Sequence, residues 1–147
     1  MRPAFLDAVE FVSLPLPMGE RPFRVRESVR YRSIVLDRVI HVPAGYRTDL
    51  ASVPWFFRRI IPQSGRYNNA ALIHDYLCDV SPKLCDHKQA ARVFLEAMEI
   101  CGVGRIKRQA MYRAVLWFGP KFEAEAGTVE DFMNVQHSTS KGESHGR

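Results

Sequence analysis

The sequence of 147 residues has few cysteines, Cys78, Cys85 and Cys101, and their odd number and irregular spacing argue against a disulfide framework and predict reduced thiols. It has no apolar run near the ~20 residues that cross a bilayer. The first residues lack a basic start, an apolar stretch and a small-residue cleavage site, so we expect no secretion through a signal peptide. The sequence contains neither a phosphate-binding glycine loop nor a Gly-x-Ser-x-Gly elbow. It therefore gives no support to a P-loop enzyme or to a serine hydrolase of the elbow type.

The composition is that of one globular domain. Apolar residues make up 46% and charged residues 25% of the chain, both ordinary values for a soluble domain. The net charge is +5, and acidic side chains outnumber basic ones after residue 118, so the excess of positive charge lies in the preceding part. No basic stripe interleaved with aromatic residues stands out. Contact with nucleic acid is therefore a weak alternative to an ordinary solvated surface.

The first half of the chain predicts an arm followed by strands. Pro15, Pro17 and Gly19 interrupt regular structure, so residues 1–20 are expected to form an extended arm or edge segment. Residues 23–42 are rich in β-branched and aromatic side chains with charges between them, which predicts antiparallel strands at about 22–27, 29–36 and 38–43. The pair Asp37-Arg38 is a plausible tight turn between the last two of these strands.

The second half predicts about four helices. The first would run from a cap at Ser52 to residue 61, and the second over residues 67–79. The third begins at Asp86, with Gln89 completing a capping box, and the fourth spans residues 105–118. Strands followed by helices indicate an α+β fold, a small antiparallel sheet of two or three strands packed against these helices. The compact domain would cover 21–118, and 119–147 would form a C-terminal segment with a flexible or partner-docked tail.

Two segments carry polar side chains among apolar neighbours, Gly45-Tyr46-Arg47-Thr48-Asp49-Leu50-Ala51-Ser52-Val53-Pro54 and Ile73-His74-Asp75-Tyr76-Leu77. Such groups are costly to bury unless they bond to each other, bind an ion or take part in chemistry. Asp49 precedes the proposed Ser52 cap and could accept backbone N–H bonds from that turn. The alternative role for Asp49 is that of a metal ligand or an acid/base group.

His74 and Asp75 are adjacent on a predicted helix, so their side chains point about 100° apart. Asp75 shares a face with Asp79, and His74 shares one with Cys78. We expect His74 to be buried and hydrogen-bonded to Asp49, a pair that stabilises the fold without turnover of substrate. If a catalytic site exists, this pair could instead orient a water molecule or hold a divalent ion, with Asp75 or Asp79 assisting.

A weaker constellation consists of residue types that bind zinc, namely His74, Cys78, Cys85 and His87. His74 and Cys78 have helical ligand spacing. However, no Cys-x-x-Cys pair occurs, and His87 lies in the first turn of a different helix. Ordinary thiols are the favoured interpretation of Cys78 and Cys85, so we expect no cofactor, with zinc or another divalent metal as the weak alternative.

The two polar segments, together with Gly65-Arg66-Tyr67, Phe94-Leu95-Glu96-Ala97-Met98 and Tyr112-Arg113-Ala114-Val115, resemble a small phage and prophage family of unknown function. Its members share a "TDLASVP … IHDYL" signature, and the likeness covers about residues 23–118. The polar positions that match are Thr48, Asp49, Ser52, His74 and Asp75. Relatives often carry an Ala-Asp pair where this chain has Ala90-Ala91. If that aspartate belongs to a catalytic or metal site, this chain lacks one of the ligands.

The resemblance implies a phage-derived gene product and brings no established activity. We therefore expect a virion or virion-assembly protein at the tail, tail tip or neck, made in the cytoplasm of the bacterial host. Its arm and tail would dock on other phage structural proteins, with a homo-oligomeric ring as one form, because burial would offset the entropy of ordering them. The alternative is a metal-dependent or His/Asp hydrolase that acts on the cell wall during infection. The residues favour the first interpretation without deciding between the two.

Overall fold

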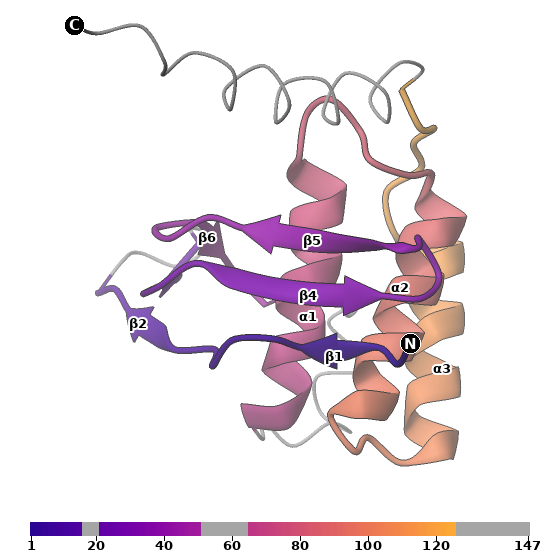
Figure 1. Cartoon of the computed structure of the whole chain (residues 1–147). Coiled ribbons are helices and arrows are strands. Elements are labelled where there is room, and N and C mark those ends of the chain that lie inside the picture. Colours follow the sequence, from indigo (N-terminus) through magenta and orange to yellow (C-terminus); the bar gives the residue numbers. More distant parts are fainter. Residues whose placement is uncertain (16–20, 51–64, 126–147) are drawn as a thin grey trace, which may run out of the picture.

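The computed structural model describes residues 1–15, 21–50 and 65–125, in which short strands form a layer against helices (Figure 1). The strands are β1 (Ala4–Phe5), β2 (Phe11–Ser13), β3 (Phe23–Val25), β4 (Val29–Ser33), β5 (Arg38–Val42) and β6 (Arg47–Thr48). The helices of this part of the chain are α1 (Gly65–Asp79), α2 (His87–Ile100) and α3 (Arg105–Phe118). The α+β class predicted from the order of the elements is confirmed.

The strands form two antiparallel sheets of three strands, in the orders β1-β4-β5 and β2-β3-β6. The prediction of one small sheet was therefore wrong. The predicted strands at 22–27 and 29–36 correspond to β3 and β4, which do not pair with each other and lie in different sheets. The N-terminal residues, expected to be an arm or edge segment, supply one edge strand to each sheet. Strands of two or three residues are too short to leave an alternating pattern in the sequence.

The strands lie along three antiparallel stretches of chain, namely β1–β2, β3–β4 and β5–β6, and each sheet takes one strand from each stretch. Phe5 faces Tyr31 in the first sheet and Phe11 faces Val25 in the second, so the pairing keeps one register across the break. The side chain of Asp7 fills part of this break, because its Oδ2 accepts a hydrogen bond of 2.8 Å from the backbone N–H of Arg30. A carboxylate thus replaces a missing ladder partner, so this backbone N–H of the central strand β4 stays hydrogen-bonded.

Helix α2 confirms the predicted capping box. The backbone N–H of Gln89 donates to Asp86 Oδ1 at 2.7 Å, and Gln89 Oε1 accepts from the backbone N–H of Asp86 at 3.1 Å. After the helix, Gly102 takes a left-handed conformation with φ of 77°, which is common where a helix ends. The predicted helices 67–79 and 105–118 correspond to α1 and α3. The predicted helix 52–61 and its Ser52 cap lie outside the described residues.

The core lies between the sheets and the pair α1–α2, and α2 separates α1 from α3 (Figure 1). Its largest fully buried side chains include Tyr31, Ile40, Leu72, Phe94 and Met98. Each large apolar side chain contributes about 1.5–3 kcal/mol when it is fully buried. Helix α1 packs against the strands on one side and against α2 on another. All of its residues from Ala70 to His74 are therefore buried. The tertiary structure thus places part of the second polar segment inside the core.

All three cysteines are free thiols, as their number and spacing predicted. Among the described residues, no helix combines the length and apolar character that crossing a membrane requires.

Candidate functional site

The two polar segments meet where β6 ends beside α1. The Thr48 hydroxyl is fully buried and donates a hydrogen bond to Asp75 Oδ2 on α1. The same hydroxyl oxygen accepts a bond of 3.0 Å from the backbone N–H of Leu50. Leu50 has a left-handed φ of 54°, an uncommon conformation for a branched residue. Thr48 therefore ties the turn after β6 to the middle of α1.

Asp75 is a carboxyl group with an unusual proton affinity. Burial raises its pKa to about 7, and the negative charges of Asp49 and Asp79 act in the same direction. The hydrogen bond from Thr48 and the positive charge of Arg21 act against this rise without cancelling it. At neutral pH the carboxyl group therefore exists in both protonation states, which is the condition for a general acid or base.

Asp79, one helical turn after Asp75, has a different environment. It pairs with Arg21, whose Nη2 donates to Asp79 Oδ1 at 3.1 Å while Nη1 donates to Oδ2. The Tyr46 hydroxyl donates to Asp79 Oδ2 at 2.6 Å. Partial burial alone would raise the pKa of Asp79, but the hydrogen bonds from Arg21 and Tyr46 outweigh it and hold that pKa below its usual value. Asp79 is therefore ionised at neutral pH and occupied in holding Arg21 and Tyr46.

Asp49 is exposed and lies close enough for its charge to raise the pKa of Asp75 and of Arg21. The expected bond from Asp49 to His74 is not seen within the described part of the chain. The bond that joins the two segments runs instead from Thr48 to Asp75. Ser52, the other predicted member of the first segment, lies outside the described residues.

His74 points away from the carboxylates and is 4% exposed. Its ring lies 5.1 Å from the ring of Phe94 on α2, measured between centroids, and Cys78 Sγ lies 3.8 Å from Nε2. Burial lowers the pKa of His74 to about 4, so the imidazole is neutral at physiological pH. Burial was predicted correctly, but the predicted carboxylate partner was wrong. The reason is the 100° step between positions 74 and 75, which turns Asp75 to β6 and His74 to α2.

The four weak zinc candidates do not converge. His87 directs Nδ1 to the carbonyl oxygen of Phe122, at 3.0 Å, and lies at the start of α2. Burial raises the pKa of Cys78 to about 12 and that of Cys85 to about 11, which favours the neutral thiols. In residues 1–15, 21–50 and 65–125, no group of three or more His, Cys, Asp or Glu side chains could hold a metal ion.

The family model "Protein of unknown function (DUF1353)" matches residues 23–115. The chain belongs to this family. The DUF1353 segment runs from β3 to α3 and contains both polar segments, but it leaves out Arg21 and the first two strands. The core and the Thr48–Asp75 bond are therefore built within the family segment, and one ionic partner of the site comes from outside it.

Two relatives come from Sinorhizobium fredii, and both are named as uncharacterized proteins. The DUF1353 chain is 38% identical to y4jT over 94 residues, which is 63% of this chain and 27% of that protein. It is 33% identical to y4iH over 78 residues, 52% of this chain and 32% of that protein. The chain thus spans about a third or less of the length of these relatives. No solved structure matches this DUF1353 chain.

Sequence reasoning missed Arg21, Tyr46 and Glu96 as partners in the polar contacts of the DUF1353 fold. Tyr46 and Glu96 stand inside segments that carry the family resemblance, but their side chains gave no local signal of a partner. Arg21 reaches Asp79 across 58 positions of sequence. The pairing of β3 with β6 brings the chain near Arg21 and Tyr46 together, and packing on α1 adds Asp79. Glu96 reaches Tyr31 across 65 positions. No local pattern could have identified these contacts.

Proposed function

We propose that this chain is a structural protein of a phage particle or of its assembly, at the tail, tail tip or neck, and that its polar signature stabilises the fold. The observation that carries the proposal is that Thr48 and Asp75 bond to each other across the two signature segments. Asp79 is likewise occupied by Arg21 and Tyr46. Polar groups that already form hydrogen bonds within the protein are less able to bind a substrate.

The burial and the lowered pKa of His74 support the same proposal. A histidine that acts in catalysis must reach the reacting atoms and have a pKa near the working pH. His74 is 4% exposed, packs on Phe94, and has a pKa lowered to about 4 by burial. These are the properties of a core side chain. The phage context comes from the sequence resemblance, and the partners would be other structural proteins of the particle, with a homo-oligomeric ring as one arrangement.

The test is to look for the chain in particles. The bacterium that carries the gene is induced to release phage, and purified particles and assembly intermediates are probed by mass spectrometry and with an antibody against the chain. The proposal expects the chain in one of these fractions, and a drop in particle yield when the gene is deleted. Its absence from both fractions, with full yield from the deletion strain, would contradict the proposal.

A second candidate function is a hydrolase that acts on the cell wall, and the specific observation in its favour is the pKa of Asp75, raised to about 7. Such a carboxyl group could serve as general acid or base near neutral pH. The assay is release of dye-labelled fragments from peptidoglycan, with and without added Zn²⁺ or Ca²⁺. This candidate expects release by the wild type, loss of release in Asp75→Asn, and full release in Asp37→Asn, an exposed carboxylate in the β4–β5 turn. Absence of release by folded wild-type protein under all conditions would reject it.

A further inference from the structure

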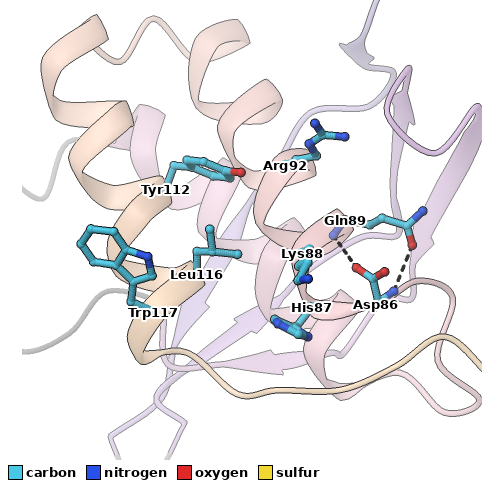
Figure 2. Close-up of a pocket in the computed structure, with 8 residues that line it drawn as sticks. All are labelled: Asp86, His87, Lys88, Gln89, Arg92, Tyr112, Leu116 and Trp117. Carbon is cyan, nitrogen blue, oxygen red and sulfur yellow. Dashed lines mark hydrogen bonds between the residues drawn. The ribbon is translucent and has the colours of Figure 1, made fainter.

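A cleft of about 570 Å³ lies between the start of α2 and the end of α3, and it is lined by different residues from those of the Thr48–Asp75 site (Figure 2). Its volume falls within the range of about 300–1,000 Å³ that is usual for small-molecule sites. Figure 2 shows that Lys88 and Arg92 come from α2, whereas Tyr112, Leu116 and Trp117 come from the neighbouring helix. The cleft therefore combines a charged wall with an aromatic one.

The charged wall carries two cations, and no anionic partner for them lies among the residues that the structure describes. Lys88 and Arg92 are four positions apart on α2 and therefore share a face, where like charges repel each other. Both are exposed, and neither forms a hydrogen bond or an ion pair with a residue of the described ranges. Asp86 also lines the cleft, but its Oδ1 accepts the capping bond of 2.7 Å from Gln89. The wall is thus complementary to an added negative charge.

The aromatic wall carries a tryptophan that the fold does not bury. Trp117 is 66% exposed, although a tryptophan side chain gains more than most from burial. Tyr112 lies five positions earlier on α3 and is half-buried, and Leu116, about one turn after Tyr112, also lines the cleft. A flat ring at the edge of a cationic cleft is the arrangement that proteins use to stack a base while cations hold its phosphate.

We propose that this cleft binds a nucleobase that carries a phosphate, with the base stacked on Trp117 and the phosphate held by Lys88 and Arg92. Two kinds of ligand carry such a base and phosphate, a single-stranded nucleic acid and a free nucleotide. No basic stripe with aromatic residues appears in the sequence, because α2 supplies the cations and α3 supplies the ring. The site is independent of the function proposed above.

The binding experiment uses the full-length chain and three probes: a fluorescein-labelled 12-residue oligothymidylate, an abasic strand of the same length, and adenosine monophosphate. Fluorescence anisotropy follows the strands, and calorimetry follows the nucleotide. We expect the thymidylate strand to bind at least about tenfold more tightly than the abasic strand, because stacking adds to the phosphate contacts. Binding of adenosine monophosphate at comparable strength would identify a free nucleotide as the source, and binding of the strand alone would identify nucleic acid.

Two variants test the walls of the cleft, each with a matched control. Lys88→Glu combined with Arg92→Glu should weaken binding at least about tenfold and reduce the salt dependence by about 0.7 per lost phosphate contact. Its control is Arg105→Glu combined with Lys107→Glu, the same charge change on exposed positions of α3 outside the cleft. Trp117→Ala should weaken binding about tenfold, whereas Ile106→Ala, at a position 87% exposed, should not.

The proposal is overturned by any of three results. The first is no binding of the thymidylate strand or of adenosine monophosphate at millimolar concentration. The second is measurable and equal binding of the abasic and thymidylate strands, which would show a general anion surface. The third is equal loss of binding in the cleft variants and in their controls. Circular dichroism of each variant confirms that it is folded before binding is measured.

Discussion

Glu96 on α2 accepts a hydrogen bond of 3.0 Å from the hydroxyl of Tyr31, which is fully buried on β4. Its other carboxylate oxygen accepts from the backbone N–H groups of Ile34, at 3.0 Å, and Val35, at 3.2 Å. One side chain therefore holds both the strand and the turn that follows it against the helix layer. Glu96 stands in a segment that carries the family resemblance, and this contact is a structural reason for its presence there.

We expect Glu96→Ala to lower the free energy of unfolding by about 2–4 kcal/mol, because it leaves two backbone donors and a buried hydroxyl without their acceptor. Tyr31→Phe removes one of these bonds and should cost about 1 kcal/mol. Urea unfolding of both single variants and the double variant gives their coupling energy, which should reach about 0.5–3 kcal/mol. Strictly additive effects would show that the bond does not contribute to stability.

Thr48→Val should destabilise the fold by about 1–3 kcal/mol. Valine has nearly the shape of threonine, so the packing is kept while Asp75 loses a donor and the backbone N–H of Leu50 loses its acceptor. Urea unfolding at pH 7 measures the loss. Thr48→Ser keeps the hydroxyl and should recover most of the stability. If the valine variant is as stable as the wild type, the contact between the two signature segments is not what stabilises them.

Asp75 should make stability depend on pH. An unfolded aspartate has a pKa near 3.8 and the folded Asp75 a pKa near 7, so between these values the folded chain keeps a proton that the unfolded chain has lost. The contribution of Asp75 to the free energy of unfolding therefore falls as pH rises through this window, by up to about 1.4 kcal/mol per pH unit. In Asp75→Asn this fall disappears. The difference in unfolding free energy between variant and wild type, measured from pH 4 to pH 8, should rise and then level off near pH 7.

The contribution of His74 to stability should depend on pH in the opposite direction to that of Asp75. Its pKa is about 4 when folded and 6.5 in an unfolded chain, so between these values the unfolded chain binds the extra proton. The contribution of His74 to stability therefore rises with pH through this window and is complete above pH 6.5. His74→Leu removes this rise, so the difference between variant and wild type should fall as pH increases from 4 to 6.5. In the wild type, the contributions of His74 and Asp75 oppose each other over that range.

Gly119 ends α3 in a position where a side chain does not fit. A Cβ atom there would collide with the carbonyl oxygen of Val115, which accepts the capping bond from the Gly119 N–H. Gly119→Ala should therefore cost about 1–3 kcal/mol. Gly104→Ser is the control, because no atom lies within 4 Å of a Cβ at that N-cap position, and serine should be neutral or stabilise by a few tenths of a kcal/mol. Thermal unfolding of both variants measures the contrast.

The elements that sequence reasoning predicted well are those with local causes. The capping box of Asp86 and Gln89 lies within a few positions of the start of the helix that it delimits. Strands β4 and β5 are joined by the short turn at Asp37, so their pairing is local as well. The edge strands β1 and β2 were not predicted as strands, because each is stabilised by a partner some 10 to 28 positions away and carries almost no pattern of its own.

The same difference between local causes and distant partners applies to the candidate site. The sequence alone determined that the polar residues of both segments would be costly to bury and would need partners, since that follows from their residue types. It also determined that His74 and Asp75 point in different directions, because this is a property of any helix. Only the tertiary structure decided that Thr48 bonds to Asp75 and that His74 packs on Phe94. Those pairings depend on how β6 and α2 are placed around α1, and that placement is set by burial of the whole core rather than by any local signal.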